Sequence, residues 1–432
     1  MSAHEPATVN PLAAAGFGAG ADAYERARPT YPPDAVAALV EQLDLREGRT
    51  VLDLGAGTGK LTRLLAPTGA RILALEPVAA MRAKLAAAVP QAELLDGTAE
   101  DIALPNGSVD AVVVGQAFHW FDAVRALSEI HRVLRPGGRL ALAWNFRDES
   151  VPWVARLGEL MHPLASATPQ ARTHVWRAAL RRDGLFEPFE TLAFHHVHRL
   201  DEAGLRERVA SVSFVAAADP AVREALLDDV SALVRSEGGP AAEAEAEADG
   251  DGLFGLPYET ELVWATRRTI EPGTSGVVVT VCQNGGGVPK APVEGAHAGR
   301  LGLDGDAHTE PEDIHGGPDR AICLYSQEAI ERVRADGHQA FPGAYGENVV
   351  VLGIDWAQLQ EADRVELGHA GEGPLLELTR HATPCQTIAH WFTERRISRI
   401  SQKANPQDAR WYARVLREGR VEPGMPARVT RP

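Results

Sequence analysis

The first half of the chain alternates short apolar runs with amphipathic stretches. Mainly apolar runs lie at 51–54, 71–75, 91–95, 110–115 and 139–144. Between them, apolar residues recur at helical spacing over 33–43, 60–65, 78–88 and 127–134. Apolar strands that alternate with helices are typical of a parallel sheet covered on both faces. The pattern therefore predicts an α/β fold built on such a sheet, with helices on both of its faces.

Polar residues stand where four of these strands end. Asp53 lies inside the first run, Glu76 ends the second, Asp96 follows the third and Gln116 follows the fourth. A charged side chain inside a buried strand is costly unless it binds something. The carboxyl ends of parallel strands form the edge of an open sheet at which ligands bind. The agreement of four strand ends predicts one ligand site at that edge.

The turn after the first strand is rich in glycine. Gly55, Gly57 and Gly59 alternate with small residues and are followed by Lys60, where a dinucleotide fingerprint has a small residue. Side chains at the glycines would hold a nucleotide-like ligand away from the backbone, and the following helix start offers free N–H groups. Glu76 follows at about 20 residues, the distance at which an acid meets ribose hydroxyls. An ordinary turn without a ligand is the competing interpretation.

Together these residues resemble the class I S-adenosylmethionine (AdoMet) methyltransferases, of the methyltransferase type 11 kind. The resemblance implies a Rossmann-like fold, AdoMet as cofactor and a small-molecule methyl acceptor. In this family the segment around Asp96 brackets the adenine ring. The implied cofactor-binding residues lie in the glycine turn and at the strand ends: Asp53, Gly55, Ala56, Gly57, Gly59, Glu76, Asp96, Thr98, Ala99 and Gln116.

The segment before the first long helix carries a second part of this resemblance. Tyr24, Arg28 and Tyr31 form a Tyr-x-x-x-Arg-Pro-x-Tyr pattern. In small-molecule methyltransferases a similar segment folds over the cofactor, which would add Tyr24 and Arg28 to the cofactor site. A helix packed on the sheet edge is an equal alternative. Residues 1–20, rich in Ala and Gly, are expected to be a flexible tail.

Methyl transfer in such enzymes is an in-line attack on the methyl carbon, for which the protein mainly supplies proximity and orientation. A general base is optional. His119, which follows the fourth strand, is the best candidate for that catalytic role. Packing or capping by His119 is an equal alternative.

The first half is expected to end with two strands at 190–200 and 256–267, which close the sheet as an antiparallel edge pair. Asp201 is expected to cap a helix that follows the first of them. Three histidines, at 195, 196 and 198, cannot all share one face of a strand, which favours a solvated strand over a metal site. The acidic run at 238–252 is expected to be a solvated helix extension or a disordered loop. The methyltransferase-like domain is expected over 21–267.

The second half changes to short strands and turns, which predicts a mainly-β, partly closed barrel. Its motifs are His315-Gly-Gly-Pro-Asp-Arg-Ala, Gly-x-x-Gly-Glu347-Asn348 and Thr-Pro-Cys385, in this order. They resemble the MOSC domain, named for the C-terminal part of molybdenum cofactor sulfurases. The expected domain covers 276–432, after a linker at 268–275.

Cys385 is the cysteine that matches the reactive thiol of MOSC proteins. Cys323 lies in an apolar run, where a thiol is usually a small hydrophobic residue. Cys282 stands at a strand end and is ambiguous. Cys385 follows a proline near Arg380 and His381, and cations of that kind favour the thiolate. The resemblance implies that Cys385 carries persulfide sulfur or ligates the molybdenum of a pterin cofactor.

Other residues of the MOSC motifs are expected to line the same cleft, with Arg320 suited to a cofactor phosphate. They are His308, His315, Asp319, Arg320, Glu347 and Asn348. In the competing interpretation the His315 motif is only a turn, and Glu347 and Asn348 form hydrogen bonds with buried backbone groups. The family also implies sulfur carriage, pyridoxal phosphate binding, a sulfur donor or reductase partner, and reduction of N-hydroxylated compounds. Large MOSC enzymes place a β-rich domain where this chain has the methyltransferase-like half. In the alternative interpretation, the MOSC half is a non-redox sulfur carrier or cofactor-binding module, and the first half is an AdoMet-binding sensor.

The composition of the chain limits the classes of partner and the cellular compartment that we expect. The chain has 432 residues and a formal charge of −16, without a long basic run, which argues against nucleic acid and anionic membranes as partners. Three cysteines without a CxxC pair, and the absence of a signal peptide or long apolar run, favour the cytoplasm.

Overall fold

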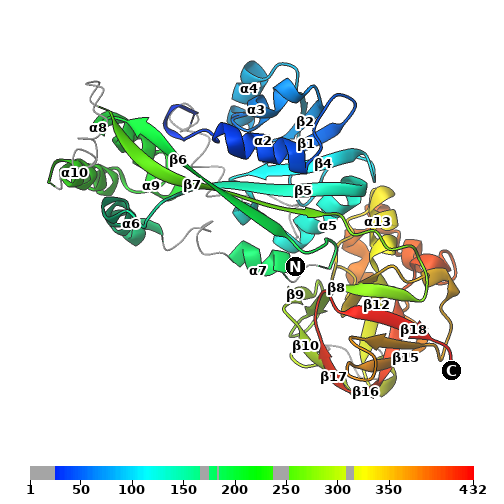
Figure 1. Cartoon of the computed structure of the whole chain (residues 1–432). Helices are drawn as coiled ribbons and strands as arrows, with labels where there is room; N and C mark the ends of the chain where they lie inside the picture. Colours follow the sequence, from blue (N-terminus) through cyan, green and yellow to red (C-terminus); the bar gives the residue numbers. More distant parts are fainter. Residues whose placement is uncertain (1–24, 166–174, 182–183, 237–252, 308–315) are drawn as a thin grey trace.

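The structure is a computed structural model, and it describes residues 25–165, 175–181, 184–236, 253–307 and 316–432. Figure 1 shows an elongated molecule in which a sheet with helices on both faces leads into a smaller barrel. Tyr24, His308 and His315 lie outside the described residues, as do the expected tail and the acidic loop. No helix in the described ranges is both long and apolar enough to cross a membrane.

The sheet of the first half has the strand order β3-β2-β1-β4-β5-β7-β6 within the described residues. Its strands are β1 (Thr50–Leu54), β2 (Arg71–Leu75), β3 (Glu93–Leu95), β4 (Val109–Gly115), β5 (Leu134–Arg147), β6 (Glu190–Leu200) and β7 (Phe254–Thr266). Strands β1 to β5 run parallel, and β7 pairs antiparallel with both β5 and β6. The chain runs outward from β1 to β3, then crosses to β4 on the other side of β1. The switch point of the sheet therefore lies between β1 and β4, where ligands bind in such folds.

Helices cover both faces of this sheet (Figure 1). On one face lie α2 (Pro33–Gln42), α3 (Thr62–Leu65) and α4 (Ala79–Ala88), and on the other α5 (Ala123–Val133) and α7 (Val175–Arg181). Leu39 shares a buried cluster with Val113, whereas Ile130 shares another with Val112, because successive residues of a strand face opposite sides. The remaining helices pack beside the outer ends of β6 and β7: α6 (Pro152–Ala165), α8 (Glu202–Ala210), α9 (Ser213–Ala216) and α10 (Pro220–Ser236).

The α/β fold and the antiparallel edge pair expected from the sequence are confirmed, and several bounds differ, three of them by enough to explain. The short helix begins at Thr62 rather than Lys60, because the glycine turn continues through Gly59. Helix α5 begins at Ala123, four residues earlier than expected, where the Asp122 side chain accepts a hydrogen bond from the Arg125 N–H (3.3 Å). Strand β5 is longer than expected at both ends.

The histidines of β6 divide between its two faces. His196 and His198 point inward, are half-buried and contact the Tyr258 ring, at centroid distances of 5.6 and 6.3 Å. His195 is exposed. The solvated strand expected from the sequence therefore describes only the outer face, because α2 and α8 lie against the inner face.

The second half forms a closed barrel. Its strands are β8 (Ser275–Gln283), β12 (Ile322–Ser326), β13 (Val349–Leu352), β14 (Arg364–Leu367), β15 (Leu375–His381), β16 (Trp411–Arg417) and β18 (Pro426–Thr430). They pair in the order β13-β12-β16-β15-β14-β18-β8, and β13 closes the ring on β8. Strand β9 (Ala291–Val293) pairs antiparallel with the end of β8. Strands β10 (Ala296–Gly299), β11 (Gly302–Leu303) and β17 (Gly419–Val421) form a small separate sheet. The mainly-β barrel expected from the sequence is confirmed.

The two halves meet along a buried polar contact. Helix α13 (Gln327–Ala335) of the barrel half lies beside α5 of the sheet half (Figure 1). Gln327 Nε2 donates to Ser128 Oγ (3.0 Å), His131 Nδ1 lies 2.9 Å from Glu331 Oε1, and Arg334 pairs with Glu129 (2.6 Å). Buried apolar residues of both halves belong to one continuous cluster. The two halves are therefore packed together as well as joined by the linker.

Substituting Glu331 by alanine should destabilise this contact. His131 is buried and would lose its acceptor, and an unsatisfied buried polar group costs about 1–3 kcal/mol. Glu394, an exposed acid that pairs with Arg396, supplies the control, because exposed pairs contribute only about 0–1 kcal/mol. We expect a lower urea midpoint for Glu331→Ala than for Glu394→Ala, measured by tryptophan fluorescence. Equal midpoints would show that the contact adds nothing to stability.

Candidate functional site

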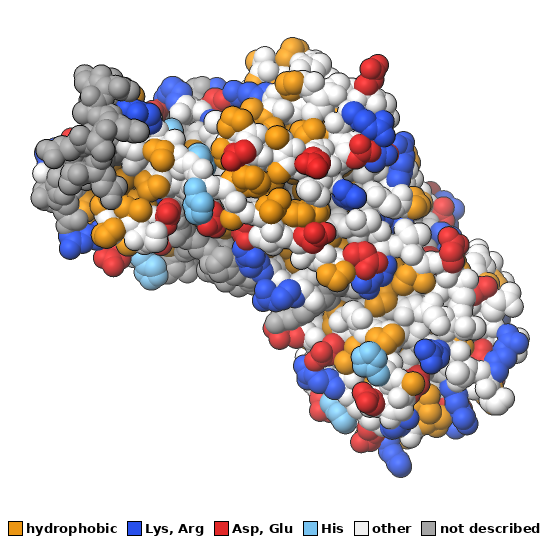
Figure 2. All heavy atoms as spheres, viewed as in Figure 1, with side chains coloured by type: hydrophobic (Ala, Val, Ile, Leu, Met, Phe, Trp, Pro, Cys, Tyr) orange, Lys and Arg blue, Asp and Glu red, His pale blue; other side chains and the backbone are white. Residues whose placement is uncertain are grey.

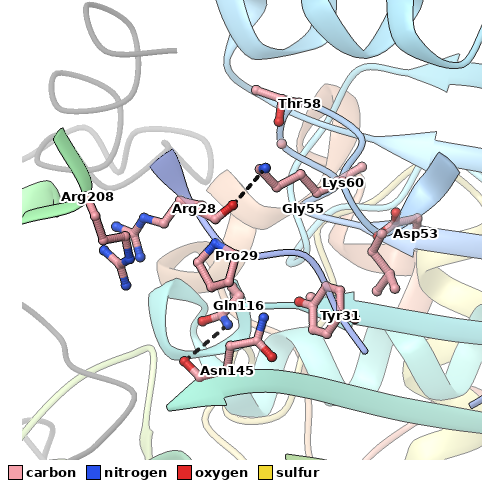
Figure 3. Close-up of a pocket in the computed structure, with 14 residues that line it drawn as sticks. Arg28, Pro29, Tyr31, Asp53, Gly55, Thr58, Lys60, Gln116, Asn145 and Arg208 are labelled. Atoms are coloured by element: carbon pink, nitrogen blue, oxygen red, sulfur yellow. Dashed lines mark hydrogen bonds between the residues drawn. The ribbon is translucent and has the colours of Figure 1, made fainter. Parts of the chain in front are cut away.

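A cavity opens at the carboxyl ends of β1 and β4, at the switch point of the sheet (Figure 3). It encloses about 560 Å³, measured out to its open mouth. Its lining comes from the N-terminal segment, the glycine turn, the ends of β4 and β5, and α8: Arg28, Pro29, Tyr31, Asp53, Gly55, Ala56, Gly57, Thr58, Lys60, Leu61, Gly115, Gln116, Asn145 and Arg208. The predicted site residues Asp53, Gly55, Ala56, Gly57, Gln116 and Arg28 are thus brought together in this cavity.

The three glycines of the turn serve different purposes. All have positive φ, at 72°, 60° and 87° for Gly55, Gly57 and Gly59. A Cβ on Gly55 would lie 2.8 Å from the Ala117 Cβ, and one on Gly59 would lie 2.6 Å from Leu85 Cδ1. A Cβ on Gly57 would meet no atom nearer than the Met81 sulfur at 3.9 Å. Packing therefore requires Gly55 and Gly59, whereas Gly57 leaves room in the cavity wall.

Asp53 is a buried carboxyl group at the cavity wall. Its Oδ2 accepts a hydrogen bond from the Thr62 hydroxyl (2.6 Å), and its Oδ1 has no hydrogen-bond partner among the described residues. Burial, together with the nearby Glu76 carboxylate, raises the pKa of Asp53 to about 7. A buried oxygen without a donor is unfavourable unless a ligand supplies one. Asp53 is therefore suited to a ligand that donates a hydrogen bond or carries positive charge.

Glu76 holds the glycine turn. One carboxylate oxygen accepts from the Gly57 N–H and the other from the Val78 N–H, each at 2.8 Å. Burial raises the pKa of Glu76. Each oxygen keeps a second lone pair, so contact with a ribose remains chemically open. Glu76 does not belong to the lining of the cavity, so its assignment to the cofactor stays a prediction.

The residues expected around an adenine ring lie beyond the end of β3. Asp96 is exposed, accepts from the Gly97 N–H (3.0 Å) and pairs with Arg82 (3.1 Å). Ala99 is buried, and the Thr98 hydroxyl has no partner among the described residues. Neither this group nor Gly59 belongs to the lining of the cavity at β1 and β4. Their cofactor contacts also stay predictions.

The loop after β4 carries Gln116 and His119. Gln116 has φ +59°, a conformation that a side chain other than glycine adopts only at a cost, and such residues cluster at functional sites. His119, in the short helix η2 (Phe118–Trp120), does not line the cavity. Burial, together with the nearby Arg28, lowers the pKa of His119 to about 4. The imidazole is therefore neutral near pH 7 and is a weak base.

The N-terminal segment lies across the glycine turn. Lys60 Nζ donates to the Arg28 carbonyl (3.0 Å), Arg28 donates to the Ser211 carbonyl (3.0 Å), and Glu25 hydrogen-bonds with Thr58 and Arg63. The segment thereby joins the glycine turn to the end of α8.

Several residues that line this cavity were not predicted from the sequence, and Asn145 and Arg208 are the two with the strongest polar groups. Asn145 lies near the carboxyl end of β5, and the rule that identified the other four strand ends would have found it. Arg208 lies on α8, far from the motifs, and its helix gives no sequence signal for a ligand-binding residue.

A second cavity, of about 730 Å³ out to its mouth, lies in the barrel half. Its lining includes Cys385, Cys323, Arg320, Asn348, Lys290, Arg410, Tyr345 and Tyr412. Cys385 is partly exposed, whereas Cys282 and Cys323 are buried. Burial raises the pKa of Cys323 to about 11 and that of Cys282 well above its usual value. Cys385 is therefore the accessible thiol.

The other predicted MOSC residues divide between lining and support. Asn348 lines the cavity, donates to Asp306 (2.8 Å) and accepts from the Cys323 N–H (3.0 Å). Glu347 is fully buried and accepts from the Gly343 and Tyr345 N–H groups, so it satisfies backbone in the loop. Asp319 lies outside the lining and pairs with Arg414 (3.3 Å). No group of three or more metal-binding side chains is placed to hold an ion among the described residues.

Comparison with known proteins bears on both halves. Residues 52–142 match the methyltransferase domain family, and residues 311–428 match the MOSC domain family. An uncharacterized methyltransferase of Mycobacterium bovis is 43% identical over 253 residues, which cover 58% of this chain and 95% of that protein. An uncharacterized methyltransferase of Schizosaccharomyces pombe is 45% identical over 139 residues, covering 32% of this chain and 55% of that protein. A malonyl-[acyl-carrier protein] O-methyltransferase of Methylococcus capsulatus is 38% identical over 169 residues, covering 38% and 57%. The chain belongs to the methyltransferase family through its first half and carries a MOSC domain in its second.

Proposed function

We propose that the first half transfers a methyl group from AdoMet to a small molecule. The observation that carries this proposal is the unpartnered Oδ1 of Asp53 in a cavity above the glycine turn. AdoMet fits these residues, because its ammonium group would donate a hydrogen bond to the Asp53 carboxylate and would place a positive charge beside it. The open wall at Gly57 gives the cofactor close access to the backbone.

In this proposal the protein acts mainly by position. Bound AdoMet supplies the electrophilic methyl carbon. Asp53 and the glycine turn hold the amino acid end, Glu76 is the candidate for the ribose, and Asp96, Thr98 and Ala99 are the candidates for the adenine. Gln116 lines the cavity at the switch point and orients the acceptor. The lowered pKa of His119 makes it an inefficient base.

Calorimetry on the full chain tests this proposal, followed by methyl transfer from labelled AdoMet to a panel of small metabolites. The panel includes oxygen, nitrogen and carbon nucleophiles, since one relative is named for O-methylation. We expect AdoMet binding and at least one methylated product. Binding without turnover would favour the sensor alternative, and absence of binding would exclude the methyltransferase function.

The affinity for AdoMet should rise with pH between about 5.5 and 7.5. Because the pKa of Asp53 is about 7, the free protein holds a proton there at lower pH, and a cationic ligand must displace it. Release of one proton changes the affinity by up to about tenfold for each pH unit below 7. Calorimetry across this range should show the slope, and Asp53→Asn should remove it. The same slope in both proteins would assign the proton to another group.

For the second half we propose that Cys385 is the functional thiol, in a cavity that takes an anionic ligand. Arg410 is buried, and its Nε has no hydrogen-bond partner among the described residues. Lys290 lines the same cavity and pairs with Asp306 (2.5 Å). These residues fit a molybdenum-pterin cofactor: Cys385 would ligate the metal, and Arg320 and Arg410 would face the phosphate. The bound cofactor would supply redox chemistry at the metal.

Two activities of this thiol remain to be separated. A reductase would consume an N-hydroxylated compound, whereas a sulfur carrier would hold a persulfide on Cys385. Three measurements on the full chain distinguish the two activities: turnover of such a compound, the Cys385 persulfide by mass spectrometry, and the molybdenum content. Turnover with bound molybdenum would support the reductase, and a persulfide without turnover would support the sulfur carrier.

A further inference from the structure

The cavity of the first half carries an excess of positive charge. Among the described residues, its charged lining consists of Arg28, Lys60 and Arg208 and of the carboxyl group of Asp53. Glu25, which lies near Lys60 outside the lining, is engaged by Thr58 and Arg63. Figure 3 shows Arg28 and Arg208 on the side of the cavity remote from Asp53. Like charges in a confined cavity repel unless an anion lies between them.

Arg208 is the most telling of these cations, because it is buried and only partly hydrogen-bonded. The residue is 5% exposed, and its Nε donates to the Tyr258 hydroxyl (2.9 Å). Its Nη1 has no hydrogen-bond partner among the described residues. Tyr258 is itself buried in the packing between β7 and the outer helices, so it fixes the direction of the guanidinium. A fixed, buried donor at a cavity wall is suited to an anionic ligand.

The cations of the cavity also lower the pKa values of neighbouring groups. Burial is the main cause that lowers the pKa of Lys60, and the cations Arg63, Arg28 and Arg208 lower it further against the opposing effect of Glu25. Burial, then Arg208 and Lys60, lowers the pKa of His198 to about 4. His198 is therefore neutral near pH 7 and adds no charge of its own.

AdoMet does not balance this charge. Its single carboxylate is accompanied by an ammonium and a sulfonium group, so the cofactor brings net positive charge to the cavity. A neutral acceptor would leave the excess in place. An anionic methyl acceptor would supply the acceptor that the Nη1 of Arg208 lacks among the described residues.

We propose that the methyl acceptor carries an oxyanion, a carboxylate or phosphate group, and that Arg208 determines this specificity by binding it. The inference rests on the proposed methyltransferase function. Arg28 and Lys60 flank the same end of the cavity and add to the attraction. Because α8 lies outside the sheet that forms the cofactor edge, Arg208 is placed to hold the acceptor rather than the cofactor.

The test uses the full chain saturated with S-adenosylhomocysteine, the product form of the cofactor. Calorimetry then measures binding of glutarate, of its neutral diamide and of inorganic phosphate. We expect at least one anion to bind at least about tenfold more tightly than the diamide. Arg208→Gln should weaken anion binding by about ten- to a hundredfold, the effect of losing hydrogen bonds to a charged group. Arg208→Lys keeps the charge without the planar guanidinium group, so its anion affinity should lie between those of the wild type and Arg208→Gln.

Arg26→Gln is the matched control, because Arg26 belongs to the same N-terminal segment but pairs with Glu207 and does not line the cavity. It should keep the anion affinity of the wild type. Binding of S-adenosylhomocysteine by Arg208→Gln should stay within about threefold of wild type, which also reports an intact fold.

Two results would overturn the inference. Equal loss of S-adenosylhomocysteine and anion affinity in Arg208→Gln would assign the arginine to the cofactor's own carboxylate. If neither glutarate nor phosphate binds the wild type more tightly than the diamide, the methyl acceptor does not need an oxyanion. Failure of the wild type to bind AdoMet or S-adenosylhomocysteine is a separate outcome, and it would remove the proposed function itself.

Discussion

Replacing Gly57 by valine should lower the affinity for AdoMet by more than about a hundredfold. The backbone at Gly57 has φ +60°, which a β-branched residue adopts only at a cost of about 1–3 kcal/mol. The added methyl groups would also enter the space next to the cavity, since no atom lies within 3.9 Å of the new Cβ. Loss of close backbone approach removes the contact that the glycine turn provides. Calorimetry with AdoMet measures the effect.

Gly107 provides a matched control for this substitution. It has φ +59°, a Cβ there would meet nothing within 4 Å, and it lies in the turn before β4, at the opposite edge of the sheet. Gly107→Val therefore carries the same backbone strain without reaching the cavity. We expect wild-type AdoMet affinity in Gly107→Val. Similar affinities in the two variants would mean that Gly57 does not border the cofactor.

The second large effect is expected at Cys385. It should be alkylated by iodoacetamide at neutral pH well before Cys282 and Cys323, because both of these are buried and have raised thiol pKa values. Cys385→Ser should abolish molybdenum content or MOSC-type activity, since a hydroxyl is a poor substitute for a soft thiolate ligand. Methyl transfer should persist, because its cavity is built from the other half.

Cys323→Ala is the control, since Cys323 lines the same cavity but is buried. It should retain the activity or the molybdenum that Cys385→Ser loses. Peptide mass spectrometry decides the labelling order. Faster labelling of Cys282 would identify a different reactive thiol, and retained activity in Cys385→Ser would exclude a thiolate mechanism.

The strand ends of the sheet could be predicted from the sequence because each combines an apolar run with a polar residue at a fixed place. Asp53 and Gln116 follow this rule, and both line the cavity. The edge pair of β6 and β7 was predictable for a similar reason, since alternation along a strand is visible without knowledge of its partner. Cys385 stood out through its motif and through the apolar surroundings of Cys323.

The polar contact between the halves could not be predicted in this way. Gln327, Glu331 and Arg334 follow the pattern of a helix whose polar face is solvated. Only the contacts with α5 bury Gln327 and leave Glu331 and Arg334 partly buried. Arg208 escaped for the same reason, because its burial depends on the packing of α8 against Tyr258. Sequence patterns report polarity, but they do not report which polar groups find partners in another element.

The contact of α5 with α13 also limits how this gene can be divided. Separation of the halves would expose the polar faces of both helices to water, and with them the ring of Phe341, which packs against Arg125 in the intact chain. Exposed apolar surface of this kind promotes aggregation. Halves made as two chains would carry this exposed surface until they met, whereas a single chain always supplies both together. The fusion thus fixes the stoichiometry of two chemically unrelated domains at one to one.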